Sequence, residues 1–314
     1  MQKILMKSNS SSLSIHDAFL NYIKKCAIKN LSQQTIKTFQ IHYSVFEKFI
    51  GADTLISEMN DNVTDDFIMY LREYNTCNDI TINSYLRTIR AFLYWLMEGG
   101  YIGRFRISIP KADKKIKETY SEAELSVLLK KPDVKKCDFT EYRMWVFSNY
   151  LLATGNRISS ALNLLICDID FDNNLIMINK TKNRKAQIIP MSKVLSNVLK
   201  EYLQYRGGEL NDYVFCTETG GKSALRTYQD GISLYNRSRG VMKTSAHLYR
   251  HTFAKQWILN GGDIFRLQKI LGHSDLTVVK EYVNMFSNDI AIDFDKFNPL
   301  DQMGINQQKT LIKM

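Results

Sequence analysis

The protein has 314 residues, of which 45% are hydrophobic and 24% charged, and its basic residues exceed its acidic ones by a formal charge of +10. That length and apolar fraction suffice for two folded domains and exclude a disordered chain or a small disulfide-stapled fold. Four prolines and 15 glycines exclude a collagen-like or low-complexity chain. No apolar run reaches the roughly 18 to 20 residues that a membrane span requires.

The compartment and the partner can be predicted from the same composition. The polar run Ser8–Ser12 is not part of an apolar segment with a small-residue cleavage site, so we expect a cytoplasmic protein. Five widely spaced cysteines without a CxxC pair indicate neither a disulfide framework nor a zinc knuckle, and we expect buried thiols. The positive charge favours a polyanionic partner such as nucleic acid, although it is also compatible with a general solubility feature.

The first hundred residues are predicted to form a small helical bundle. Ser14 precedes apolar residues at three- and four-residue spacing, which is typical of a capped amphipathic helix. The last helix of the bundle is expected to end at Gly99 and Gly100, where a left-handed cap is favourable. The four helices are expected to begin at Ser14, to run from about Ser32 to Ile50, to pass through Phe67–Leu71 and to run from Asp79 to about Glu98. This bundle is assigned to residues 14–103, after a flexible N-terminus over residues 1–13.

A basic stretch follows over residues 104–117, and Pro110 interrupts any helix there. We interpret it as an interdomain linker. It is either a solvated tether or, in the interpretation that we favour, a strap along a phosphate backbone. Its basic residues, which face the single acidic Asp113, are Arg104, Arg106, Lys111, Lys114, Lys115 and Lys117.

The second half of the chain is predicted to be mostly helical with a small antiparallel sheet. Ser121 and Glu124 form a capping box before an apolar run. A hairpin is expected from the extended pattern on either side of the polar turn 181–184. The other elements expected are a helix over 138–153 ended by Gly155, strands over 175–179 and 187–189, and helices over 192–205, 223–237 and from His247 onward.

Three of the five histidines, His247, His251 and His273, lie close together in the sequence. His247 and Arg250 are three positions apart, so on a helix they share a face and can address one anion. The same histidines allow another interpretation, because His247 and His251 at i and i+4 could ligate a metal. That pair lacks the second-position Glu of a zinc motif and a convincing third ligand, so no metal site is predicted.

Four motifs in order carry a resemblance to a known family: Ala153–Ser159 with Arg157, the His-x-x-Arg of His247 and Arg250, the Leu-Gly-His at 271–273, and Tyr282 nine residues later. Together they resemble the tyrosine recombinases, or phage integrase family. The resemblance implies a mainly α fold with a small antiparallel β-sheet, in which a helical SAM-like core-binding domain precedes a mixed α/β catalytic domain over 118–287. It also implies that a C-terminal segment, residues 288–314, docks on a neighbouring protomer, whereas packing on its own domain is the alternative.

The resemblance also implies the roles of the site residues. Tyr282 would be the nucleophile, and Lys182 on the hairpin the general acid, although Lys180 or Lys185 could replace it if the turn register differs. His247 would exchange the tyrosine proton, and His273 would bond the phosphate. The full set implied is Arg157, Lys182, His247, Arg250, His273 and Tyr282.

Taken singly, these residues allow simpler interpretations. Tyr282 could be an ordinary helix tyrosine, Arg157 could cap a helix, and His251 is expected to pack or bond structurally. The sequence also departs from the family where Asn156 replaces an apolar residue and Ser160 an acidic one, and where Ala246 replaces a frequent proline. These departures concern residues that support the site and leave the catalytic set intact.

The DNA-binding residues are predicted from charges that lie off the apolar stripes. On the helices of the first domain these are Lys37, Arg87 and Arg90, which could reach phosphates or base edges, whereas plain solvation is the simpler interpretation. On the linker they are Arg104, Arg106, Lys111, Lys114 and Lys115.

The function predicted is site-specific recombination through a 3′-phosphotyrosyl intermediate, for integration or excision of a mobile element or for resolution of DNA. No metal and no nucleotide cofactor is expected, because the phosphotyrosine holds the bond energy. The expected partners are double-stranded DNA with core sites and, on that DNA, three further copies in a tetramer, with the protein on the nucleoid when bound. The alternatives are a catalytically silent repressor with the recombinase fold and a type IB topoisomerase.

Overall fold

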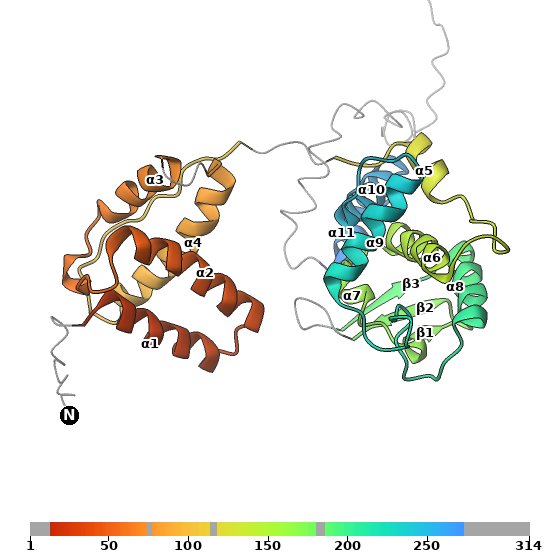
Figure 1. Ribbon diagram of the computed structural model, residues 1–314, viewed down its shortest axis with the longest axis horizontal. Helices are drawn as coiled ribbons and strands as arrows, with labels where there is room; N and C mark the ends of the chain where they lie inside the picture. Colours follow the sequence, from red (N-terminus) through yellow and green to blue (C-terminus); the bar gives the residue numbers. More distant parts are fainter. Residues whose placement is uncertain (1–12, 74–76, 114–117, 180–185, 273–314) are drawn as a thin grey trace, which may run out of the picture. The chain divides into compact units, whose positions relative to one another are not determined.

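The computed structural model describes residues 13–73, 77–113, 118–179 and 186–272 (Figure 1). The chain divides into two compact units, Met1–Lys115 and Ile116–Met314, and each unit has its own hydrophobic core. Among the described helices, none is long and apolar enough to cross a membrane.

The first unit contains the four predicted helices. Side-chain oxygens of Ser14, Ser32 and Asn78 accept hydrogen bonds from backbone amides of the first turn, which is why three of the helices begin where they do. After the last helix it is Gly100, with φ +71°, that adopts the left-handed conformation. The helices are α1 (Ile15–Ile28), α2 (Gln33–Ile50), α3 (Val63–Glu73) and α4 (Asp79–Glu98), with a short 3-10 turn η2 (Ile56–Glu58) between α2 and α3.

An aromatic cluster joins these helices. Phe19 of α1 stacks on Tyr43 of α2 with ring centroids 3.7 Å apart, and Phe92 of α4 meets both rings edge-on at 5.3 and 5.9 Å. Phe46 meets Phe67 at 5.0 Å and so ties α3 to α2. Such geometries add to the burial of large apolar area, and they explain how four short helices hold together.

The chain beyond α4 continues along the same unit. Ile102 and Ile107 are 9% and 3% exposed and belong to the core of the first unit, and the side-chain amide of Asn83 donates to the carbonyl of Pro110 at 2.9 Å. The first half of the stretch predicted as a linker is therefore anchored on the first unit. Charge and Pro110 alone did not indicate this, because the anchoring is done by the apolar residues between the charges.

The second unit is built around α6, which is buried on nearly all sides and packs against α8, α9 and α10 (Figure 1). A helix with buried residues on nearly all sides is expected at the centre of a unit. The predicted capping box of Ser121 and Glu124 is confirmed. The helices are α5 (Glu122–Leu128), α6 (Phe139–Thr154), α7 (Ile158–Ala161), α8 (Lys193–Arg206), α9 (Leu225–Ser238), α10 (Ala246–Leu259) and α11 (Ile264–Leu271), with a 3-10 turn η3 (Ile166–Asp168).

The sheet is antiparallel, in the order β1 (Ile169–Asp170), β2 (Leu175–Ile178), β3 (Gln187–Pro190). The predicted hairpin corresponds to β2 and β3, with Ile178 opposite Gln187. Buried and exposed side chains alternate along β2, so one face of the hairpin lies against the core. The strand β1 was not predicted, since two residues are too few for a periodic pattern.

The cysteines differ from the prediction of five buried thiols. Cys26 and Cys216 are buried, Cys77 and Cys137 are half-buried, and Cys167 is exposed. Cys167 lies in the turn η3, where the chain passes over the surface, and residue type alone does not reveal such a position.

Candidate active site

Helix α10 carries two of the predicted catalytic residues. The Ser245 hydroxyl caps the helix by accepting from the backbone N–H of His247 at 3.3 Å, so His247 lies in the first turn and is exposed. Arg250 lies one turn further along and is only 5% exposed. The helix thus carries an exposed histidine and, one turn further along, a buried arginine.

The guanidinium of Arg250 joins two other parts of the chain. Its Nη1 donates to the carbonyl oxygen of Gly155 at 2.7 Å, and its Nη2 donates to that of Leu271 at 2.8 Å. Gly155 stands two residues before Arg157, and Leu271 stands two residues before His273. A single buried side chain therefore connects the segments that carry three of the predicted phosphate ligands, which are far apart in the sequence.

Arg157 follows a sharp corner between two helices. Gly155 ends α6 in the left-handed conformation, with φ +62°, and Arg157 occupies the N-cap position of α7 with extended backbone. The simpler interpretation is that Arg157 caps a helix. Its backbone does occupy the N-cap position, but its side chain makes no capping hydrogen bond. That side chain is half-buried.

The replacement Gly155→Ala is expected to lower stability and activity together. A Cβ there would lie 2.5 Å from Phe253 and 2.8 Å from Leu271, besides the roughly 1–2 kcal/mol that a left-handed conformation costs a non-glycine residue. Moving Leu271 would move a carbonyl that Arg250 holds. Gly100→Ala is the matched control, because Gly100 also has positive φ but no atom within 4 Å of the added carbon. Urea denaturation should show a larger loss for Gly155→Ala by about 1–3 kcal/mol, the usual cost of overpacking. Equal losses would contradict the close packing at this corner.

Asn156, which stands where the family usually has an apolar residue, has a hydrogen-bond partner in this chain. Asn156 is 5% exposed, and its side-chain amide donates to the hydroxyl of Tyr150 at 2.8 Å. Burial raises the pKa of Tyr150 above its ordinary value, so this hydroxyl stays protonated and neutral. The buried amide is therefore satisfied, and it fixes the corner from which Arg157 projects.

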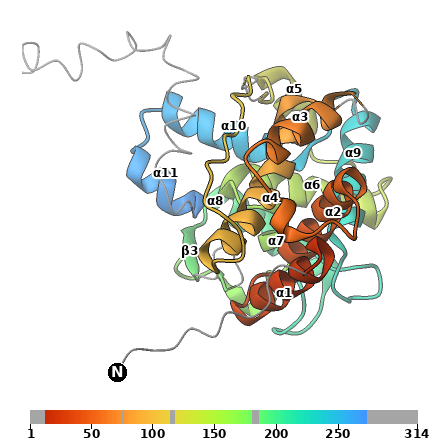
Figure 2. The same ribbon diagram turned by 90° about the vertical axis from the view of Figure 1, so that its left-hand side faces the viewer.

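The hairpin is attached to the end of α11. Helix α11 and strand β3 lie side by side (Figure 2), and the side-chain amide of Gln187 donates to the carbonyls of Lys269 and Ile270. Gly272 caps α11 with φ +62°, and a Cβ on it would lie 2.8 Å from Oε1 of Gln187. The strand that follows the predicted general-acid turn thus begins beside the residue that precedes His273. Sequence reasoning missed Gln187, because a lone glutamine at a strand start gives no signal.

Several predicted site residues lie outside the described residues. These are Lys182 with its alternatives Lys180 and Lys185, His273, Tyr282, the linker residues Lys114 and Lys115, and the segment 288–314. Their roles remain predictions. His251 is half-buried on α10, and the described ranges contain no group of three or more His, Cys, Asp or Glu side chains that could hold a metal ion.

The predicted DNA-binding residues of the first unit are mostly accessible. Lys37 on α2 and Arg87 on α4 are exposed, and Arg90, one turn beyond Arg87, is half-buried. The helices α2 and α4 pack against each other. On the anchored segment, Arg104, Arg106 and Lys111 are all exposed.

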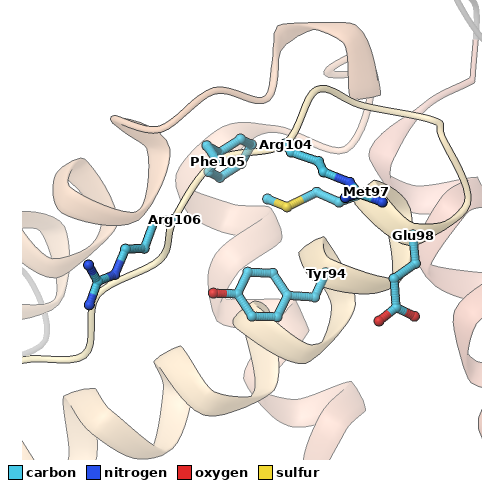
Figure 3. A pocket seen from close by; sticks show the side chains of 6 residues that line it. All are labelled: Tyr94, Met97, Glu98, Arg104, Phe105 and Arg106. Carbon is cyan, nitrogen blue, oxygen red and sulfur yellow. The ribbon is translucent and has the colours of Figure 1, made fainter.

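A hollow of about 440 Å³ lies between this segment and α4 (Figure 3). Arg104 and Arg106 border it on the segment, and Tyr94, Met97 and Glu98 border it on α4. Figure 3 shows Phe105 between the two arginines. Side chains along this segment alternate in their surroundings: the apolar ones contact the first unit, and the arginines remain in solvent.

Known protein families match both units of the chain. The phage integrase family pattern matches residues 118–288, and that of the phage integrase SAM-like domain matches residues 14–107. Tyrosine recombinase XerC of Staphylococcus aureus is 25% identical over 284 residues, which cover 88% of this chain and 93% of that protein. Tyrosine recombinase XerA of Saccharolobus solfataricus is 24% identical over 307 residues, which cover 94% of this chain and 96% of that protein.

Solved structures show the same fold. The Tn1549 transposon integrase in complex with transposon right end DNA superposes with a TM-score of 0.71 at 18% identity, over 89% of this chain and 99% of that one. The XerH site-specific recombinase bound to palindromic difH substrate superposes with a TM-score of 0.69 at 18% identity, over 88% and 84%. At these identities the likeness concerns the fold alone.

Proposed function

Because this chain belongs to the phage integrase family of tyrosine-type site-specific recombinases, we propose that it cuts and rejoins DNA through a 3′-phosphotyrosyl intermediate with Tyr282 as nucleophile. The observation that carries the proposal is the position of Arg250. Its guanidinium holds the corner before Arg157 and the helix end before His273, so the described part of the site is built around one buried cation.

The two arginines suit the charge that develops during cleavage. A DNA phosphodiester is an anion, and its transition state spreads further negative charge over the nonbridging oxygens. Guanidinium groups remain charged at neutral pH and donate parallel hydrogen bonds in a fixed fork, so Arg157 and Arg250 stabilise the transition state more than the ground state. Arg250 is already oriented by its carbonyl partners, so little rearrangement is needed when the phosphate arrives.

The remaining steps move two protons. The Tyr282 hydroxyl, with an ordinary pKa of ~10, gives its proton to His247 as its oxygen attacks phosphorus. The bond from phosphorus to the 5′-oxygen breaks, and Lys182 protonates that oxygen as it leaves. His273 donates a hydrogen bond to the phosphate. Rejoining reverses these steps with another 5′-hydroxyl. Because the phosphotyrosine holds the bond energy, the proposed reaction requires neither a metal nor a nucleotide.

The biological role that we propose is integration or excision of a mobile element, or resolution of DNA. Relatives named tyrosine recombinase XerC and XerA support site-specific recombination as the common basis of these roles. The working assembly would be a tetramer on two duplexes with core sites, in the cytoplasm and on the nucleoid when bound.

Trapping on a nicked suicide duplex tests the proposal. When a bound site carries a nick next to the cleavage position, cleavage releases a short fragment that carries the 5′-hydroxyl. Because this fragment diffuses away, rejoining is prevented and the covalent protein–DNA product accumulates. We expect this product in the presence of EDTA and without nucleotide. Absence of the product on a site that the protein demonstrably binds would favour the alternative, a DNA-binding repressor with the recombinase fold.

The basic segment gives a separate prediction for DNA binding. Replacing Arg104, Arg106, Lys111, Lys114 and Lys115 by glutamine should weaken binding and flatten its salt dependence. Each lost phosphate contact lowers the slope of log K against log salt by about 0.9. Titrations at several salt concentrations measure this slope. The matched control replaces five exposed lysines elsewhere: Lys24, Lys25 and Lys29 of the first unit, and Lys135 and Lys136 of the second. An equal change in slope for both variants would argue for a general charge effect and against a strap.

A further inference from the structure

A buried hydrogen-bond network lies next to the start of α10 in the second unit. We call it the Asn236 network; its members are Tyr120, Ser148, Asn236, Lys243 and Tyr249. Asn236, Ser148 and Tyr249 are 0% exposed and Tyr120 is 3% exposed. None of them belongs to the predicted catalytic set, and Tyr249 is the immediate neighbour of Arg250.

The side-chain amide of Asn236 bonds through both its nitrogen and its oxygen. Its Nδ2 donates to the Tyr120 hydroxyl at 2.8 Å and to the carbonyl of Lys243 at 2.7 Å, and its Oδ1 lies 3.2 Å from the Tyr249 hydroxyl. An amide nitrogen has two protons and an amide oxygen has none, so only this orientation satisfies all three contacts. The flipped amide would place its oxygen against the carbonyl of Lys243. The network therefore specifies one arrangement.

The two tyrosines extend the network to the surrounding helices. The Tyr249 hydroxyl has one proton, which it donates to Oδ1 of Asn236, and it accepts from the Ser148 hydroxyl of α6 at 3.0 Å. Burial raises the pKa of Tyr249 to about 12, so the hydroxyl stays protonated and can donate at neutral pH. Helix α10 is thereby fixed in rotation against α6 and α9, one residue from Arg250.

Tyr120 ties the network to the first turn of α10. Its hydroxyl donates toward the carbonyls of Lys243 and Ser245, at 3.3 and 3.4 Å. The carbonyl of Ser245 also accepts from the N–H of Leu248 in the first turn of α10. The backbone N–H of Tyr120 donates to the Thr252 hydroxyl at 2.9 Å. Tyr120, near the start of the second unit, is thus bonded to the helix that carries His247 and Arg250.

Lys243 adds a second tie between the same parts. Its Nζ donates to the carbonyl of Thr119 at 3.0 Å and forms an ion pair with Glu124 at 2.9 Å. Glu124 also accepts from the backbone of Ser121, and this bond is the main reason that the pKa of Glu124 is lowered. The carboxylate therefore stays charged at neutral pH and holds the loop before α10 onto the start of α5.

We propose that the Asn236 network positions the catalytic face of α10, so that contacts of Tyr120 with this helix set how fast His247 and Arg250 act on a bound phosphate. The inference rests on the proposed function for its kinetic readout. Tyr120, Asn236 and Tyr249 are positioning residues, since they act through α10. Their effect should appear in the cleavage step, because displacements of about 1 Å from a distant substitution cost up to 10²-fold in rate.

Two matched substitutions test this. Tyr120→Phe and Tyr235→Phe each remove one buried hydroxyl that donates to a backbone carbonyl, but the Tyr235 hydroxyl donates to Leu128 at 2.7 Å. We expect Tyr120→Phe to slow single-turnover cleavage of a bound suicide substrate by about 10-fold to 100-fold with unchanged DNA affinity. Backbone amides over 246–250 should also exchange with deuterium faster. Tyr235→Phe should do neither. If Tyr120→Phe does not fold, Tyr249→Phe replaces it with the same expectation.

Equal exchange over 246–250 in the two variants would overturn the proposal, as would wild-type cleavage by Tyr120→Phe. The exchange measurement uses the full chain without DNA, so it decides the role of the network even if the wild-type protein forms no covalent product. That absence would count against the proposed function alone.

Discussion

Replacing Tyr282 by phenylalanine is expected to abolish covalent attachment to DNA while leaving DNA binding intact. The substitution removes only the oxygen that would attack phosphorus, and no other group of the proposed site forms a covalent bond in that step. The measurement is denaturing gel electrophoresis of the protein after incubation with a suicide duplex, next to a binding titration of the same variant.

The control for this experiment is Tyr205→Phe, which removes the hydroxyl of an exposed tyrosine on α8. It should form the covalent product at the wild-type rate. A product that persists in Tyr282→Phe would remove Tyr282 as the nucleophile. The chain has 17 tyrosines, and only the spacing after Gly272-His273 selects this one.

The second large effect is expected for Arg250→Lys. Lysine keeps the charge but cannot donate two bonds in a fixed fork, so it cannot hold the carbonyls of Gly155 and Leu271 together. Loss of a preorganised donor to a charged transition state typically costs about 10²–10³ in rate. A buried carbonyl without its partner costs about 1–3 kcal/mol of stability. Single-turnover cleavage and thermal unfolding measure the two effects.

Arg143→Lys separates these two effects. Arg143 is 6% exposed, and its Nη1 donates to the carbonyl of Cys216 at 2.6 Å, but it belongs to the core of α6 and to no predicted site. Both variants should unfold at lower temperature, and only Arg250→Lys should lose cleavage by two orders of magnitude or more. If both variants are folded at the assay temperature and cleave at similar rates, the role of Arg250 is structural, which would weaken the proposed mechanism.

Most helices could be predicted because the residues that determine where they begin lie close to that point in the sequence. Ser14, Ser32 and Ser121 cap helices through bonds to the next turn, and that signal lies within four residues of sequence. The hairpin of β2 and β3 was recognisable from its alternating pattern. Strand β1 was not, because its two residues pair with β2 only once the tertiary fold exists.

The sequence predicts a set of site residues, but it does not indicate how the described ones are arranged. The spacing of His247 and Arg250 on one helix followed from the sequence, whereas the bonds of Arg250 to Gly155 and Leu271 span 95 and 21 residues. No local pattern indicates which carbonyl a buried guanidinium reaches. The same holds for Asn236 and Tyr120, which are 116 residues apart.

The linker shows how a correct observation can be incomplete. The charges of 104–117 predicted a linker that is either a solvated tether or a strap along a phosphate backbone, and Arg104, Arg106 and Lys111 are exposed. The isoleucines between them anchor the first half of the segment in the core of the first unit. Charge density therefore predicted which side chains face solvent, but not to which unit the backbone belongs.

The most direct test of the proposed mechanism is to identify the residue that carries DNA after suicide trapping. After nuclease and trypsin digestion, the cleavage sites at Lys280 and Lys296 release residues 281–296, in which Tyr282 is the only tyrosine. Mass spectrometry should find the nucleotide remnant on this peptide, attached to Tyr282. A remnant on any other peptide, or no covalent product at a site that the protein binds, would contradict the mechanism.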